Sequence, residues 1–245
     1  MPANIASVLP DRIRTGTRGS ASHAGPRGLS TEAPLLIFEL RRYRVASGRL
    51  PDVRRRFAEH LPPLFARHHL NVLGRWTATA SDAPASFVYL LGFDRLDARQ
   101  SAWAGFYIDP QWQQVRASTN AGSEMIERTG LAFLSPSAAC DGLDSRRWSG
   151  GIHELVDQRV AIGQKAVVEA FFADVYIPAL RASGADVLWL AEAITGEDLP
   201  QFSYILRWRT TEDRRAAQPL LESTARLGAA LLLGTRAMEM NWVSS

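Results

Sequence analysis

One nine-residue pattern occurs twice in this chain of 245 residues, as Ile37–Val45 and again as Ile152–Val160. Both copies have a glutamate followed by a leucine at the third and fourth positions, and Glu154 lies 115 positions after Glu39. Self-similarity at a fixed separation indicates repeated structural units. The sequence therefore predicts a duplicated domain whose two halves fold alike.

Hydrophobic periodicity predicts the helices and strands of the first half. Alternation with a period of two indicates a strand, and apolar residues three and four positions apart indicate a helix. Pro62 and Pro63 should bend the first helix because proline has no N–H to donate, and Asp109-Pro110 should start a new helix within the second. We predict strands at 35–45, 71–79, 87–93 and 129–134, and helices at 50–64 and 97–117. This order is typical of a ferredoxin-like βαββαβ domain.

The second half repeats the same order of elements. We predict strands at 152–160, 187–192, 202–209 and 236–243, and helices at 165–183 and 211–227. A four-stranded antiparallel sheet with helices on one face must have its other face covered, and the other half can provide that cover. We therefore predict an α+β protein in which two ferredoxin-like (βαββαβ) domains are fused into a barrel within one chain.

Composition divides the chain into four expected segments: a disordered leader at 1–34, a domain at 35–137, a linker at 138–150 and a second domain at 151–245. The leader is rich in arginine, glycine and serine and has little periodicity. It resembles a mitochondrial transit peptide, although we favour an untidy N-terminal extension. Lys165 is the only lysine among 28 basic residues, which is typical of a GC-rich bacterial genome. We expect a cytoplasmic protein, with the mitochondrial matrix as the alternative for a eukaryotic source.

Charge and residue counts argue against several classes of function. A net charge of +3 is too small to indicate a nucleic-acid partner. No apolar run approaches the roughly 20 residues that span a bilayer, so no membrane segment is expected. Cys140 is the only cysteine, which permits no internal disulfide and fits a reducing compartment. The histidines lack zinc-site spacing and no cofactor motif is present, so we predict neither a metal nor a cofactor.

Four short motifs of the first half resemble the NIPSNAP family, and the resemblance covers residues 35–136. The second half matches only in degraded form, with Val156 and Gln158 at the positions of an arginine and a tyrosine. The motifs are Glu39-Leu40-Arg41-Arg42-Tyr43, Gly74-Arg75-Trp76, Val88-Tyr89-Leu90 and Asp109-Pro110-Gln111-Trp112. The resemblance implies a dimeric α/β-barrel fold, whose superfamily includes cofactor-free monooxygenases, isomerases and haem-handling enzymes. It implies no established reaction, and eukaryotic members of the family act partly as protein-interaction partners.

The polar face of the first strand is the predicted catalytic site. Glu39, Arg41 and Tyr43 lie on one face, which we expect to point into the barrel. In a functional interpretation, Glu39 is a base with a pKa raised by burial and Arg41 anchors an anion. In a structural interpretation, which we favour, the two residues pair with each other or with the facing sheet. Glu154 has no matching arginine two positions on, so we expect both glutamates to have cross-barrel or backbone partners.

Aromatic residues of both halves are the predicted ligand-binding residues. Trp76, Tyr89 and Tyr204, with Glu154 and with Trp189 and Trp208 nearby, could wall a cavity for a small apolar or acidic ligand, or could simply form the barrel core. We expect a small-molecule-binding or protein-binding barrel module. The alternative is a small-molecule enzyme, similar to a cofactor-free monooxygenase or isomerase, acting in the barrel cavity. Internal duplication leaves a homo-oligomer open.

Overall fold

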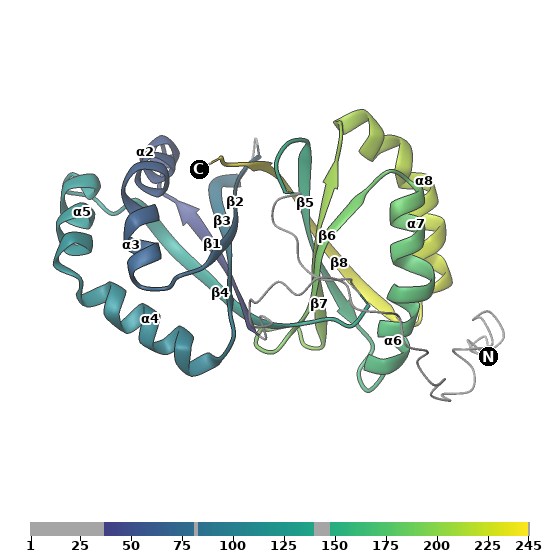
Figure 1. Cartoon of the computed structure of the whole chain (residues 1–245). Helices are drawn as coiled ribbons and strands as arrows, with labels where there is room; N and C mark the ends of the chain where they lie inside the picture. The colour runs from purple at the N-terminus through teal and green to yellow at the C-terminus, as the bar shows by residue number, and fades with distance from the viewer. Residues whose placement is uncertain (1–36, 81–82, 140–147, 245) are drawn as a thin grey trace, which may run out of the picture.

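Eight antiparallel strands form one closed barrel in the order β1-β3-β2-β8-β5-β7-β6-β4. The computed structural model describes residues 37–80, 83–139 and 148–244. Figure 1 shows the two groups of strands face to face, with helices only on the two outer flanks. The predicted mixed α/β barrel within a single chain is therefore confirmed. The predicted leader at 1–34, most of the predicted linker and Cys140 lie outside the described residues.

The first half of the barrel runs from β1 to β4. Its first helical segment includes a π-helical turn, η2, directly before Leu61-Pro62-Pro63, where the missing proline N–H groups loosen the regular helical pattern. The predicted start of a new helix at Asp109-Pro110 is confirmed: the helical region at 97–117 is two helices, because Asp109 adopts an extended conformation between them. The elements are β1 (Ile37–Val45), α2 (Leu50–Arg55), η2 (Arg56–His60), α3 (Leu61–Arg67), β2 (Val72–Ala80), β3 (Ala83–Phe93), α4 (Leu96–Ile108), α5 (Pro110–Asn120) and β4 (Ile126–Pro136).

The second half repeats this sequence of elements, including a π-helical turn, but has one helix where the first half has α4 and α5. The elements are β5 (Ile152–Val160), α6 (Lys165–Phe171), η4 (Phe172–Tyr176), α7 (Ile177–Ala182), β6 (Asp186–Ala193), β7 (Gln201–Trp208), α8 (Thr211–Leu227) and β8 (Leu232–Trp242). The last strand of each half begins several residues before its predicted start. Among the described residues, no helix is both long enough and apolar enough to cross a membrane.

Two short junctions close the barrel. β2 meets β8 where Trp76 lies opposite Trp242, and β4 meets β6 where Leu134 lies opposite Ala193. Each junction joins the second strand of one half to the fourth strand of the other. Pairing these strands removes exposed sheet edges at the junctions.

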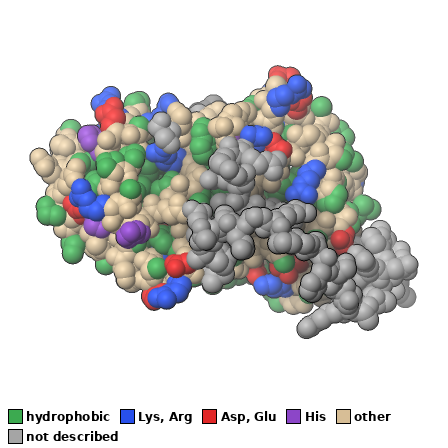
Figure 2. Space-filling model, viewed as in Figure 1, with side chains coloured by type: hydrophobic (Ala, Val, Ile, Leu, Met, Phe, Trp, Pro, Cys, Tyr) green, Lys and Arg blue, Asp and Glu red, His purple; other side chains and the backbone are tan. Residues whose placement is uncertain are grey.

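Apolar side chains form three layers. The barrel interior holds Phe38, Leu40, Trp76, Val88, Trp189, Ile205 and Met240, with Trp148 packed against Trp76. A second layer lies between the first four strands and α2–α5, and a third lies between the last four strands and α6–α8. The surface that Figure 2 displays has basic and acidic side chains interspersed over the described residues, in keeping with a net charge of +3.

Equivalent ring contacts show that the two halves pack alike. Phe57 lies against Phe87 and Tyr89, with centroid distances of 4.3 and 5.0 Å. In the second half, Phe172 lies against Phe202 and Tyr204, at 5.3 and 5.9 Å. In both cases the ring comes from the π-helical turn and the partners come from the third strand of that half.

Candidate functional site

Glu39, Arg41 and Tyr43 face the helices of the first half, so the prediction that they point into the barrel is wrong. Their neighbours across the β1–β3 pairing are Leu91, Tyr89 and Phe87, which all belong to the helix-facing layer. The intervening residues Phe38 and Leu40 fill the barrel interior instead. The physical reason is that α4 supplies polar partners to the helix-facing layer, whereas the barrel interior is mainly apolar.

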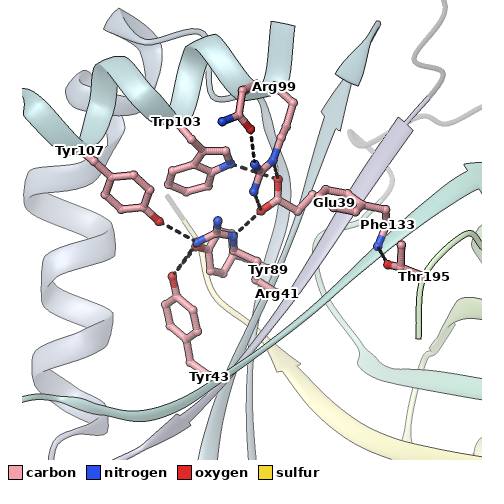
Figure 3. Close-up of polar contacts among 10 residues, drawn as sticks. Glu39, Arg41, Tyr43, Tyr89, Arg99, Trp103, Tyr107, Phe133 and Thr195 are labelled. Atoms are coloured by element: carbon pink, nitrogen blue, oxygen red, sulfur yellow. Dashed lines mark hydrogen bonds and ion pairs between the residues drawn. The ribbon is translucent and has the colours of Figure 1, made fainter. Parts of the chain in front are cut away.

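Four N–H donors surround the Glu39 carboxylate, which is fully buried (Figure 3). The Nε of Arg41 donates to Oε1 at 2.5 Å, and Arg99 of α4 donates through Nε to Oε2 at 2.7 Å and through Nη2 to Oε1 at 3.1 Å. The indole of Trp103 donates to Oε2 at 3.0 Å. Burial alone would raise the pKa of Glu39, but the hydrogen bonds and charges of Arg99 and Arg41 lower it below its usual value. Glu39 is therefore an ionised structural group and is not poised as a base.

In the first half, Arg99 of a helix thus holds the buried Glu39 of the first strand, an arrangement that we call the glutamate clamp. The second half contains an equivalent glutamate clamp. Arg214 of α8 donates to Glu154 at 2.5 Å, and the indole of Trp208 donates to the other carboxylate oxygen at 3.3 Å. Arg214 lies 115 positions after Arg99, the separation that also relates Glu154 to Glu39. The expected cross-barrel or backbone partners are wrong, because both glutamates bind a helix of their own half. The repeat contained a signal for these two arginines, which sequence reasoning missed.

Arg41 joins this clamp to a cluster of three tyrosines. Its Nη1 lies 3.3 Å from the hydroxyl of Tyr43, 3.5 Å from that of Tyr89 and 3.3 Å from that of Tyr107. The hydroxyl oxygens of Tyr43 and Tyr89 are 2.6 Å apart, and the guanidinium of Arg41 lies 3.8 Å from the centre of the Trp103 ring. Burial disfavours the cation, but Tyr89, Tyr43 and Glu39 together raise the pKa of Arg41 above its usual value. Burial raises the pKa of Tyr89 well above its usual value, so its phenol stays protonated.

These tyrosines form one end of a cavity of about 430 Å³, which we call the helix–sheet pocket. Its walls come from α2, η2, α3, α4, α5 and the start of β4. They are mostly aromatic and aliphatic, and include Val53, Phe57, Leu61, Phe65, Trp103, Phe106, Trp112 and Met125. Its polar lining residues are Tyr43, Tyr89, Tyr107, Arg56, Arg116, Glu124 and Thr129. A cavity of this volume that combines apolar walls with convergent polar groups is typical of a small-molecule site.

Arg56 contributes a second cation to the helix–sheet pocket. It is 7% exposed, and its guanidinium donates to the side chains of Thr119 at 2.8 Å and Asn120 at 2.5 Å. Its guanidinium carbon also lies 5.6 Å from the centre of the Trp112 ring. Burial lowers the pKa of Arg56 to about 10, so the group remains a cation at neutral pH. Within the described part of the chain, no carboxylate forms an ion pair with it.

The Asp109-Pro110-Gln111-Trp112 segment builds one wall of the pocket. Asp109 caps α5 by accepting from the backbone N–H groups of Gln111 at 2.8 Å and Trp112 at 3.4 Å. Its other oxygen lies 2.9 Å from Nη1 of Arg67 and 2.8 Å from Nε2 of His68, which fastens α5 to the end of α3. Trp112 then packs against Phe106 at a centroid distance of 4.7 Å.

Replacing Asp109 by alanine is expected to lower the melting temperature of the full chain by a few degrees, because α5 loses its cap and its attachment to α3. Thermal unfolding followed by circular dichroism measures this effect. Asp97→Ala is the matched control, since Asp97 lies in the first turn of α4 with an exposed side chain that accepts from Arg95 and from the backbone N–H of Ala98. Equal melting temperatures for the two variants would contradict the role of Asp109.

The predicted ligand-binding residues lie in three different places. Tyr89 lines the helix–sheet pocket, whereas Trp76 and Trp189 lie inside the barrel. Tyr204 lies under the helices of the second half, where its hydroxyl is 3.5 Å from that of Tyr176. Trp208 and Glu154 are on the same side as Tyr204. The predicted aromatic-walled cavity is therefore wrong as a single site.

His153 lies in the barrel interior. It is fully buried, with its ring 6.0 Å from that of Trp76 and 5.9 Å from that of Trp242. Burial lowers the pKa of His153 to about 4, although the backbone of Trp148 favours the charged ring. Nowhere in the described ranges do three or more histidine, cysteine or acidic side chains gather as a metal site would require.

Two buried groups make the stability of the fold depend on pH in separate ranges. His153 binds a proton more readily in the unfolded chain, so stability is complete above pH 6.5 and falls as the pH drops towards 4. The lowered pKa of Glu39 makes its contribution complete above pH 4.5, and this is lost as the pH falls through the folded-state pKa. In urea unfolding, His153→Phe should flatten the fall in unfolding free energy between pH 6.5 and 4.5, and Glu39→Gln should flatten it only below that range. An unchanged slope in His153→Phe would contradict this assignment.

Comparison with solved structures identifies the fold. A putative monooxygenase from Lactobacillus acidophilus aligns with a TM-score of 0.59 and 8% identity, over 86% of this chain and 95% of that chain. A putative monooxygenase from Fusobacterium nucleatum aligns with a TM-score of 0.56 and 8% identity, over 86% and 93%. At this identity the likeness shows the fold alone: a mixed α/β barrel that spans nearly the whole chain.

Sequence comparison places a family likeness in the first half. The NIPSNAP family model matches residues 38–140, which is less than half of the chain. An uncharacterised NIPSNAP domain protein from Burkholderia xenovorans is 24% identical over 44% of this chain and 100% of that chain, with a TM-score of 0.37. No curated protein matches the sequence.

Proposed function

We propose that the protein binds a small, largely apolar molecule that carries an acidic oxygen, and that the molecule occupies the helix–sheet pocket. The polar end of the pocket offers donors. The phenol oxygens of Tyr43, Tyr89 and Tyr107 accept from Arg41. The hydrogen bond between the hydroxyls of Tyr43 and Tyr89 uses only one of their two protons. One O–H of that pair and the O–H of Tyr107 have no acceptor among the described residues, which leaves them for a ligand oxygen.

Charge favours an anionic ligand over a neutral one. Glu39 carries one negative charge against the positive charges of Arg41 and Arg99, so this cluster has a net charge of +1. Arg56 adds another cation to the pocket wall, whereas the charges of Arg116 and Glu124, which also line the pocket, cancel in an ion pair. Because these groups are shielded from water, their attraction for an anion is stronger than that of exposed charges. This excess of buried positive charge and O–H donors around an apolar pocket is the observation that carries the proposal.

The second half supports a single site. Val156 and Gln158 take the places of Arg41 and Tyr43, and Glu222 lies 115 positions after Tyr107. The side chain of Gln158 is engaged by Thr235 and by the carbonyls of Arg159 and Gly234. We therefore assign structural support to the second half, in which the glutamate clamp is kept and the donor cluster is not.

We also propose that the two halves are ferredoxin-like domains, at 35–137 and 151–245, that arose by duplication. The repeated order of elements, the paired π-helical turns and the two glutamate clamps support this proposal. The single cysteine supports a reducing, cytoplasmic location.

Fluorine NMR of the full chain labelled with fluorotryptophan tests the proposed function. Trp103 and Trp112 line the helix–sheet pocket, and substitution by phenylalanine identifies their resonances. Titration with cinnamate should shift both resonances saturably, and the neutral amide cinnamamide should bind about tenfold more weakly because it lacks the charge. The proposal fails if neither resonance moves, or if the acid and the amide bind equally.

A second candidate is catalysis in the same pocket. The hydrogen bond of 2.6 Å between Tyr43 and Tyr89, next to the charge of Arg41, could stabilise a developing enolate or phenolate oxygen. The catalytic residues would then be tyrosines, because Glu39 has all its acceptor sites engaged. Oxygen uptake in the presence of naphthol, above that of a Tyr43→Phe variant, would support this candidate. Equal uptake would remove it.

A further inference from the structure

A second, larger cavity of about 670 Å³ lies between α3 and β2, beside the end of β8. We call it the β2 cavity. Its apolar lining includes Phe65, Leu73 and Trp242, and its polar lining is His69, Asn71 and Arg75. Phe65 contributes to the walls of both this cavity and the helix–sheet pocket.

Arg75 is the unusual residue of the β2 cavity. It is 9% exposed, and its Nη1 donates to the backbone carbonyl of Phe57 at 2.6 Å. That carbonyl belongs to the π-helical turn η2. Within residues 37–80, 83–139 and 148–244, Arg75 forms no ion pair with any carboxylate. Among the residues that the structure describes, this buried cation with five N–H donors has one neutral acceptor, the Phe57 carbonyl.

A buried charge without a counter-ion is costly, and proteins keep one only where it is satisfied by other means. A glutamine at this position could donate to the Phe57 carbonyl without carrying a charge. The hydrogen bond to that carbonyl therefore does not by itself require an arginine. Leu190 lies 115 positions after Arg75, at the equivalent place in the second half, and it belongs to an apolar layer. The arginine is thus particular to the half that contains the cavity.

We propose that the β2 cavity binds a small monocarboxylate with an aromatic or aliphatic body. The carboxylate pairs with the guanidinium of Arg75, which presents two parallel N–H donors to such a group. The apolar body lies against Phe65, Leu73 and Trp242. This site is separate from the helix–sheet pocket and does not depend on the function proposed for it.

Trp242 reports on the site in the full chain labelled with fluorotryptophan. Its resonance is identified by its loss in Trp242→Phe. Titration with diphenylacetate should shift this resonance saturably, and the neutral diphenylacetamide should bind about tenfold more weakly. In Arg75→Gln, the affinity for the acid should fall to that for the amide. Arg41→Met is the matched control in the other pocket and should leave the Trp242 response unchanged.

Ala66→Phe provides an independent test if Arg75→Gln fails to fold. Ala66 is an exposed residue of α3 that lines the cavity, so a phenyl group there should fill the cavity without disturbing the core. The Trp242 resonance should then no longer respond to diphenylacetate. The proposal is overturned if diphenylacetate does not shift the Trp242 resonance of the wild-type chain, or if the acid and the amide bind equally. It is also overturned if Ala66→Phe, or a folded Arg75→Gln, binds the acid as the wild type does.

Discussion

Replacing Glu39 by alanine is expected to lower the free energy of unfolding by about 3–5 kcal/mol, the usual cost of removing one partner from a buried ion pair. The carboxylate accepts from Arg41, Arg99 and Trp103, and all these contacts are lost together. The two arginines are then left next to each other under α4 without their counter-ion. Urea unfolding at neutral pH measures the loss.

An exposed glutamate provides the matched control. Glu127 pairs with Arg44 at the surface, so Glu127→Ala should cost no more than about 1 kcal/mol. Glu154→Ala should behave like Glu39→Ala, because Glu154 is buried against Arg214 and Trp208. If Glu39→Ala were as stable as the Glu127 control, the glutamate clamp could not be the structural element that the two halves share.

Arg41→Met is expected to weaken the binding of cinnamate to the helix–sheet pocket by about 10- to 100-fold, the range for losing one charge-assisted interaction. The side chain is replaced by one of similar length, and Glu39 keeps Arg99 and Trp103 as partners. The fold should therefore survive, while the tyrosine hydroxyls lose the cation that orients them. The affinity for cinnamamide should change much less.

Arg44→Met is the control for this variant, because Arg44 lies three positions further along the same strand and is exposed. It should bind cinnamate as the wild type does. Equal weakening in both variants would indicate a general electrostatic effect. Unchanged binding in Arg41→Met would contradict the role of Arg41 as the cation that orients the tyrosine hydroxyls.

Much of the architecture could be predicted from local patterns. The repeated Glu-Leu motif and the alternation of helices and strands predict a closed sheet within one chain, which the strand order confirms. Asp109 and Pro110 mark the start of α5, because capping and proline geometry are local effects. Patterns of this kind depend on neighbours in sequence.

The direction in which the first strand faces could not be predicted from the strand alone. Glu39, Arg41 and Tyr43 alternate with Phe38 and Leu40, and alternation is the same whichever face is inside. The choice depends on α4, which carries Arg99, Trp103 and Tyr107 to the polar face. These partners are about 60 positions away from β1. The separation of 115 between Arg99 and Arg214 is a sequence signal for Arg99 alone, because Gln218 and Glu222 stand at that separation from Trp103 and Tyr107.

The predicted aromatic site failed for a related reason. Trp76 and Tyr89 lie on neighbouring strands, but their side chains point to opposite faces of the sheet. Tyr204 belongs to the other half and to a third layer. Residue type alone does not distinguish these layers, since each is lined by large aromatic rings.

The position of a bound acid tests the central claim most directly. A crystal structure of the full chain with cinnamate is expected to place the carboxylate within hydrogen-bonding distance of the hydroxyls of Tyr43 or Tyr107, with the ring against Trp103 under α4. A ligand found inside the barrel, between Trp76 and Trp189, would contradict the account.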